Sequence, residues 1–81
     1  MQVSVRLGAG LSRLAAAPLL TVELAEGATV ADLYARLRET EPGLAPALRS
    51  VLPVVGGEHV QSERPLAHRE QVALLLPVSG G

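Results

Sequence analysis

The stretch QVALLLPVSGG, residues 71–81, decides the fold. Residues 71–76 form an apolar run of the length of a strand, which is typical of a buried strand at the centre of a sheet. Pro77 has no backbone N–H, so the strand is expected to end before it. The sequence therefore predicts one folded domain over residues 1–76 and a flexible tail over residues 77–81.

Two hairpins are indicated upstream of this run. Apolar and polar side chains alternate in residues 2–7 and 20–24, so both segments are expected to be strands with one buried face. A third strand is predicted at residues 51–55 and a short fourth at residues 58–60, joined by a tight turn at the two glycines between them. Pro53 cannot donate to a ladder, so it is expected at the start of its strand or on an unpaired side.

One helix is predicted between the two hairpins. Apolar side chains recur at i, i+3, i+4 and i+7 in residues 30–37, which places them on one helical face. Thr29 is expected to cap the first turn together with Asp32, three residues later, as in a capping box. The helix is expected to end near Thr40, because Pro42 disfavours helical geometry in the residue before it.

The order of these segments, β-β-α-β-β-β, predicts an α+β domain in which a mixed sheet packs on one main helix. This is the ubiquitin-like, β-grasp topology. Residues 43–50 are expected to form a loop with at most a short helical turn. Leu66 is expected to return to the core after a surface turn.

The composition argues against several classes of function. The 81 residues carry a net charge of −1 and one aromatic side chain, Tyr34, so the basic stripes and stacking platforms of nucleic-acid-binding proteins are absent. The lack of cysteine removes disulfides, thiolate nucleophiles and cysteine-based metal sites. His59 and His68 each stand alone, so no metal site is predicted. No apolar stretch is long enough to cross a membrane and no secretory signal is visible, so the protein is expected in the cytoplasm.

The terminal Gly80-Gly81 pair points to chemistry at the end of the chain. Glycine has no Cβ, so such a tail can thread a narrow channel and leaves its last carbonyl open to attack. The terminal carboxylate is an anion at neutral pH and must be activated, as by adenylation with ATP on a partner enzyme. A sulfur nucleophile could then displace AMP. The alternative is that the two glycines are merely a frayed, inert end.

Three stretches carry a resemblance to a known family: residues 72–81 (VALLLPVSGG), residues 52–60 (LPVVGGEHV) and residues 64–66 (RPL). The chain resembles the small, sulfur-carrying subunit of molybdopterin synthase, although that family commonly has phenylalanine where Leu74 and Leu75 stand. The resemblance implies a sulfur carrier that is not catalytic alone and binds no cofactor itself. It also implies two partners, an adenylating enzyme related to ubiquitin activators, which uses ATP, and the large catalytic subunit of molybdopterin synthase.

The same resemblance assigns roles to the tail. Gly81 is expected to be adenylated and then thiocarboxylated, and to donate its sulfur to the dithiolene of molybdopterin. The preceding residues are expected to enter the active site of a partner; they are Pro77, Val78, Ser79 and Gly80. An apolar patch beside the tail would position it for insertion. The residues expected in that patch are Leu74, Leu75, Leu76 and Val54.

Three other functions remain open. The sulfur could serve thiamine, cysteine or tRNA thiolation instead, or the protein could be a ubiquitin-like modifier joined to lysines of other proteins. The chain has no lysine, so side-chain-linked homopolymers are excluded. The last alternative is a β-grasp interaction module whose end is inert.

Overall fold

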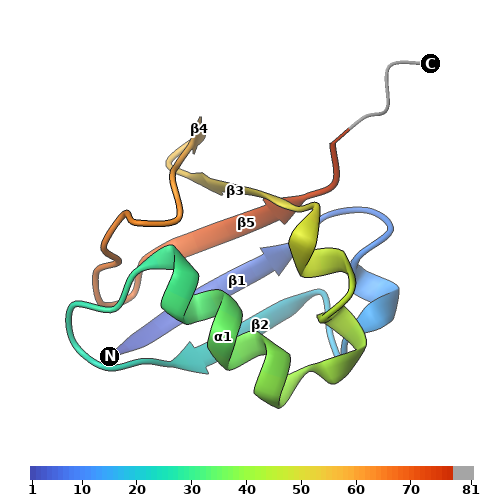
Figure 1. The fold of residues 1–81 in the computed structure, drawn as a ribbon, viewed down its shortest axis with the longest axis horizontal. Helices are drawn as coiled ribbons and strands as arrows, with labels where there is room; N and C mark the ends of the chain where they lie inside the picture. Colours follow the sequence, from blue (N-terminus) through green and yellow to red (C-terminus); the bar gives the residue numbers. More distant parts are fainter. Residues whose placement is uncertain (78–81) are drawn as a thin grey trace.

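The computed structural model describes residues 1–77, which fold into one five-stranded sheet with an α-helix across one face (Figure 1). The main elements, in chain order, are β1 (Gln2–Leu7), β2 (Leu19–Glu23), α1 (Val30–Thr40), β3 (Leu52–Val55), β4 (Glu58–His59) and β5 (Gln71–Leu75). Single turns of 3-10 helix lie in two of the loops; they are η1 (Ser12–Leu14), η2 (Pro42–Leu44) and η3 (Ala47–Arg49). The predicted α+β class and the order of strands and helix are confirmed.

The strands lie in the order β2-β1-β5-β3-β4, so β5 is central, as predicted. β1 and β5 run parallel, and the other neighbours are antiparallel. Parallel strands need a crossover connection, and here α1 lies within the long connection between β1 and β5. The sheet order and the single covering helix confirm the ubiquitin-like β-grasp fold.

The core fills the space between α1 and one face of the sheet. Alternate residues of the parallel pair point into it, and Val3, Val5, Val72 and Leu74 have no exposed surface. The helix contributes the apolar face that its periodicity predicts. The buried residues of α1 are Val30, Leu33 and Leu37. The core is thus built from aliphatic side chains that must fill it without large aromatic groups.

A capping box holds the first turn of α1. The Thr29 N–H donates to Asp32 Oδ2 at 2.9 Å, and the Asp32 N–H donates to Thr29 Oγ1 at 3.3 Å. The acidic side chain is also favoured by the partial positive charge at a helix N-terminus. The helix ends at Thr40, before Glu41 and Pro42. Both predicted ends of the helix are confirmed.

The loops contain more regular structure than the sequence predicts. Residues 43–50 were expected to hold at most one helical turn, but two turns, η2 and η3, lie between residues 42 and 49. Each turn buries one leucine, Leu44 or Leu48, so burial rather than local propensity accounts for them. A third turn, η1, was not predicted, and it follows the fully buried Leu11.

Pro53 is the second residue of β3 and is buried. Its carbonyl accepts the Val60 N–H at 3.0 Å, on the side of β3 away from β5. In an antiparallel ladder the N–H and C=O of one residue point to the same neighbour, so the missing N–H also falls on that side. The pairing of β3 with β5 is therefore intact, and the predicted position of Pro53 near the strand's start is confirmed.

Candidate functional site at the end of the central strand

The predicted tail begins where β5 ends. The strand stops at Leu75, and Leu76 and Pro77 follow as exposed residues. The remaining tail residues lie outside the part of the chain that the structure describes; they are Val78, Ser79, Gly80 and Gly81. Their predicted roles stay predictions, and the site is argued from the surface around the end of β5.

The loop after β1 packs against the last residues of β5. The Gly8 N–H donates to the Leu74 carbonyl at 2.9 Å. A Cβ added at Gly8 would lie 3.0 Å from Leu75 Cδ2, and one added at Gly10 would lie 3.2 Å from Leu76 Cδ1. Gly10 also has a φ of 89°, which glycine adopts without steric cost. Glycine at these two positions allows this close approach.

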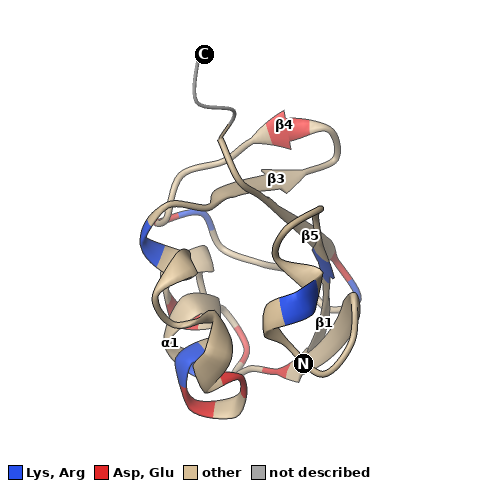
Figure 2. Cartoon of the chain, turned by 90° about the vertical axis from the view of Figure 1, so that its right-hand side faces the viewer, with Lys and Arg blue, Asp and Glu red and all other residues tan. Residues whose placement is uncertain are grey.

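An apolar patch lies on the face of the sheet opposite α1. Leu52 of β3 pairs with Leu75 of β5, and Val54 pairs with Ala73, so these four side chains share one face. Leu52 is 38% exposed and Leu75 is 41% exposed. Figure 2 shows that β3 and β5 carry no charged residue. We call Leu52, Val54, Ala73 and Leu75 the open-face patch.

The prediction that Leu74 contacts a partner is wrong. Successive side chains of a strand point to opposite faces, and Leu74 points into the core with no exposed surface. Leu75 and Leu76 do remain exposed, and Val54 is partly exposed. Three consecutive leucines show no alternation of apolar and polar residues, so the sequence did not indicate which of them face the core. Leu52, which the prediction omitted, takes its place in the patch through its pairing with Leu75.

Polar side chains border the open-face patch in the same row, meaning the line of cross-strand neighbours that runs across this face of the sheet. The register places Arg6 beside Ala73 and His59 beside Val54, and both polar residues are exposed. Leu19, on the other side of Arg6, is 52% exposed. The row thus presents apolar surface with one guanidinium and one imidazole. A complementary partner surface would be apolar at its centre and acidic opposite Arg6.

A bidentate ion pair fixes the loop that enters β5. Arg64 Nη1 and Nη2 donate to Glu70 Oε1 and Oε2 at 2.9 Å each, and the Ala67 N–H donates to Glu70 Oε1 at 3.0 Å. The hydrogen bonds from Arg64 lower the pKa of Glu70 from its ordinary value. Such a two-point contact fixes orientation as well as distance. This pair, which no local pattern in the sequence predicted, holds the start of the central strand.

The sequence matches the ThiS family over residues 5–81. The chain belongs to this family. The match includes every residue that carried the resemblance, and it confirms the predicted membership in the ubiquitin-like sulfur carriers. Among curated proteins, no sequence gives a significant match to this ThiS family chain.

Several solved structures share the fold. SAMP1 from Haloferax volcanii has a TM-score of 0.89 and 25% identity, with 100% of each chain covered. The putative molybdopterin converting factor subunit 1 from Pyrococcus furiosus has a TM-score of 0.86 and 24% identity, covering 96% of this chain and 99% of that one. A chain from the complex of subunits 1 and 2 of the Helicobacter pylori molybdopterin-converting factor has a TM-score of 0.74 and 24% identity, with 100% of each chain covered.

Two other kinds of site are absent from the part of the chain that the structure describes. Within residues 1–77, no group of three or more acidic, histidine or cysteine side chains is placed to hold a metal ion. Over the same range, no helix is long and apolar enough to cross a membrane. His68 Nδ1 accepts the Gln2 N–H at 3.0 Å, so this histidine serves a backbone contact between the last loop and β1.

Proposed function

We propose that this protein is a sulfur carrier that bears a thiocarboxylate on Gly81 and donates sulfur for the dithiolene of molybdopterin. In this role it is the small, non-catalytic subunit of molybdopterin synthase. The observation that carries the proposal is the open-face patch beside the end of β5, in a ThiS family chain that ends in Gly80-Gly81. The name of the P. furiosus relative, a converting factor subunit, favours this pathway among those open to the family.

Loading of the terminus takes two steps, both on a partner enzyme. The Gly81 carboxylate attacks the α-phosphorus of ATP, pyrophosphate leaves, and an acyl adenylate forms. Hydrosulfide then attacks the carbonyl carbon, the bond to AMP breaks, and loss of a proton leaves C(=O)–S⁻. The carboxylate needs this activation because it is an anion at neutral pH and a poor electrophile. ATP is consumed by the adenylating enzyme, and this chain keeps no bound cofactor.

During loading the carbonyl carbon of Gly81 is the electrophile, whereas during delivery the sulfur that it carries is the nucleophile. The thiocarboxylate sulfur attacks an electrophilic carbon of the acceptor, and an oxygen leaving group on that carbon departs with the electron pair of its broken C–O bond. Water then hydrolyses the acyl–sulfur bond, which leaves a thiolate on the acceptor and restores the carboxylate of Gly81. Five residues from Pro77 onward extend over roughly 16 Å at about 3.3 Å per residue. That reach suffices for the tail to enter an active site while the folded domain stays outside it.

The two partners have to hold the domain while the tail reacts. The open-face patch adjoins the end of β5 and carries no charge, so it suits docking by an apolar surface. The H. pylori structure pairs subunit 1 with subunit 2 of its converting factor. By analogy, a large catalytic subunit is the partner that accepts sulfur from this chain, and the adenylating enzyme is the partner that loads it.

Reconstitution tests the chemistry directly. The protein is incubated with an adenylating enzyme, ATP and sulfide, and its intact mass is measured; one oxygen should be replaced by sulfur, at Gly81. Transfer is then followed by adding the large subunit and the molybdopterin precursor. A chain that lacks Gly81 should fold normally and accept no sulfur. Sulfur loading of that truncated chain, or none of the full chain, would contradict the proposal.

The docking surface is tested by a matched pair of substitutions. Leu75→Arg places a charge in the open-face patch and should weaken binding to the large subunit by about fivefold or more. Leu14→Arg is the control, because Leu14 is 42% exposed but lies on η1, outside the patch. Both variants should unfold at the denaturant concentration of the parent protein. Equal loss of binding in the two variants would remove the patch from the proposal.

A second candidate function is attachment to other proteins. The likeness to SAMP1, a protein named as a small archaeal modifier, favours it. Activation would follow the same first step, but a lysine amine rather than sulfide would attack the Gly81 adenylate or its thioester. Peptide mapping of proteins from the native cell distinguishes the two, since a modifier leaves Gly81 in an amide bond to a lysine side chain.

A further inference from the structure

β2 is an end strand with one free edge, because it pairs with β1 alone. The Leu7 N–H bonds to the Pro18 carbonyl and the Leu24 N–H bonds to the Met1 carbonyl, both at 2.8 Å. Even-numbered residues of this segment therefore turn their backbone groups toward β1, and odd-numbered ones turn theirs away. The residues with outward backbone groups are Leu19, Thr21 and Glu23. Within residues 1–77 no backbone hydrogen bond reaches them from another element.

This edge lacks the features that commonly prevent strand addition. β2 contains no proline, its register with β1 has no bulge, and its charge is confined to the last residue, Glu23. The opposite end strand, β4, has two residues and follows directly on a glycine turn. Of the two edges, β2 is the one that offers an added strand several consecutive partners.

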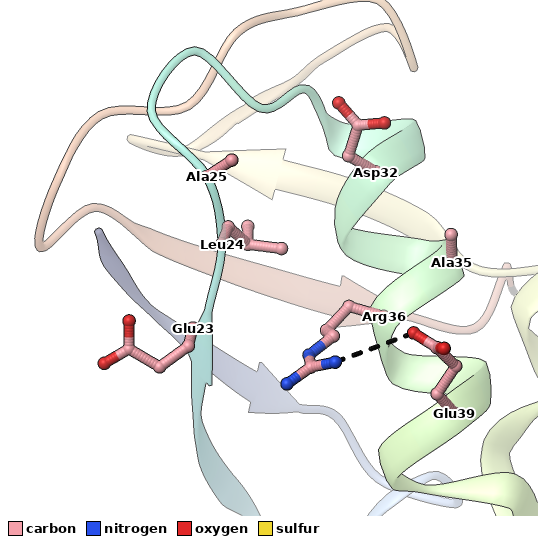
Figure 3. Close-up of a pocket in the computed structure, with 7 residues that line it drawn as sticks. All are labelled: Glu23, Leu24, Ala25, Asp32, Ala35, Arg36 and Glu39. Carbon is pink, nitrogen blue, oxygen red and sulfur yellow. Dashed lines mark ion pairs between the residues drawn. The ribbon is translucent and has the colours of Figure 1, made fainter.

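A groove runs beside the free edge, between β2 and α1. Two adjoining hollows of about 380 and 220 Å³ share Glu23 and Arg36 in their linings. Leu20 in the smaller hollow and Leu24 in the larger one are partly exposed, whereas the other two apolar residues of the smaller hollow, Val22 and Leu37, are buried. In the larger one, the Arg36 side chain extends from α1 toward β2, with Nη1 3.7 Å from Glu39 Oε1 (Figure 3). We call the two hollows together the edge groove.

The charges around the edge groove select one kind of occupant. Four carboxylates, Glu23, Asp32, Glu39 and Glu41, and one guanidinium, Arg36, are among its lining residues, a formal charge of −3. Asp32 lies in the first turn of α1, and Glu39 and Glu41 lie at its other end, so acids flank Arg36 on both sides along the helix. Exposed charges of this kind add selectivity more than affinity. A cationic segment is attracted and an anionic one is repelled.

We propose that the edge groove binds an extended segment of another protein, aliphatic at alternate positions and flanked at both ends by lysine or arginine. The segment adds to β2 as a sixth strand through the outward backbone groups of Thr21 and Glu23. Its aliphatic side chains cover the partly exposed Leu20 and Leu24, and its flanking cations lie near the acids. The tail of a second copy does not fit, because residues 77–81 contain no basic residue.

Amide hydrogen exchange measured by NMR tests the proposal with the capped synthetic peptide KKVTVTVKK. The expected signature alternates along β2. Exchange at the Thr21 and Glu23 amides should slow by about tenfold or more on saturation, because these N–H groups gain acceptors. The Leu20 and Val22 amides, already directed at β1, should change far less. The peptide EEVTVTVEE, with reversed flanks, should give no such protection at the same concentration.

A variant of the protein and a modified peptide each test the backbone pairing between β2 and the added strand. Thr21→Pro removes one outward N–H while leaving the pairing of β2 with β1, since proline is accepted where an edge N–H faces solvent. Thr21→Val is the matched control that keeps the N–H, so it should retain peptide binding that Thr21→Pro loses. A version of the peptide N-methylated at alternate residues provides the same test with the unaltered protein. Sulfur loading at Gly81 should be equal in both variants, because Thr21 lies outside the open-face patch.

Three outcomes would overturn the proposal. One is binding of the lysine peptide with protection at the open-face patch and none at Thr21 and Glu23. Another is equal binding of the two peptides. The third is protection of both β2 amides before any peptide is added, with dimers seen by sedimentation, which would make a second copy the occupant.

Discussion

The two faces of the sheet carry the same kind of side chain in opposite surroundings. On the face under α1, Val5 and Leu74 have no exposed surface, whereas on the other face Leu52 and Leu75 are 38% and 41% exposed. Burial contributes to stability in proportion to the apolar area removed from water. Position in the alternation, rather than residue type, therefore separates the leucines that hold the fold together from those that are free to meet a partner.

Substitution of adjacent leucines in β5 gives the largest expected effect. Leu74→Ala should lower the free energy of unfolding by about 2–5 kcal/mol, because it removes buried methyl groups and leaves a cavity. Leu75→Ala should cost less than about 1 kcal/mol, since much of its side chain is already in water. Chemical denaturation of the two variants measures both values. Similar losses would show that the open face contributes to stability as the covered face does.

Gly43→Ala tests the close contact between Gly43 in η2 and Leu14 in η1. The added Cβ would lie 2.5 Å from the Leu14 carbonyl oxygen, closer than such atoms approach, and a backbone atom cannot move aside as a side-chain tip can. We expect a loss of about 1–3 kcal/mol, from displacement of η2 relative to η1.

Gly27→Ala is the comparison for this steric effect. Gly27 has a φ of 80° but nothing within 4 Å of an added Cβ, so its cost is conformational, about 1 kcal/mol. Gly43 is not among the glycines with positive φ, so its cost is purely steric. If thermal denaturation ranks Gly27→Ala as the more damaging change, the contact of Gly43 with Leu14 is less tight than the structure indicates.

The features that could be predicted from the sequence are those formed by residues close together along the chain. The helix and its capping box were predictable because Thr29, Asp32 and the apolar face of α1 lie within a few residues of one another. The contact of Gly43 with Leu14 and the approach of Gly8 to Leu75 join residues far apart in the chain, so no local pattern reports them. The fold was predictable from the order of local segments, but the surfaces depend on register.

The candidate site was predictable in the same uneven way. Leu75 and Leu76 were named as docking residues and are exposed, whereas Leu74 was misplaced and Leu52 was omitted. Both errors have one origin, since neither a run of identical residues nor a strand read alone shows which residues pair across it. The chemistry predicted for Gly81 came from the family resemblance and from the residue type, and it stays a prediction because Gly81 lies outside the residues that the structure describes.

Tyr34 is partly buried, between the exposed and the fully buried residues compared above. Its substitution should change the free energy of unfolding only slightly. Its ring packs against the core, yet its hydroxyl oxygen is buried without a hydrogen-bond partner in the described part of the chain. Burial raises the pKa of Tyr34 to about 12 from 10.0. Tyr34→Phe removes a hydroxyl that makes no bond, so stability should stay within about 1 kcal/mol of the parent or rise.

The alkaline limb of stability gives a second measure of Tyr34. A raised pKa in the folded state means that folding favours the protonated phenol, so stability should fall as the pH rises from 10 toward 12. Unfolding midpoints measured over that range should show this loss in the parent protein and a smaller one in Tyr34→Phe. A clear loss of stability in the variant at neutral pH would mean that the hydroxyl has a partner after all.

The ion pair of Arg64 and Glu70 lies in the loop before β5 rather than on either face of the sheet. Removing it should change the stability of the protein less than the substitutions above. Arg64 lowers the pKa of Glu70, so the stability that this carboxylate contributes is present above its ordinary pKa of 4.5 and is lost as the pH falls through its lower value in the folded state. Arg64→Gln should raise the pKa of Glu70, as followed by NMR titration of its side chain, and should make stability less dependent on pH below 4.5. The amides of β5 and the open-face patch should keep their positions in the spectrum. Because the Ala67 N–H still bonds to Glu70 in that variant, a pKa that does not move would assign the lowering to this backbone contact instead of the guanidinium.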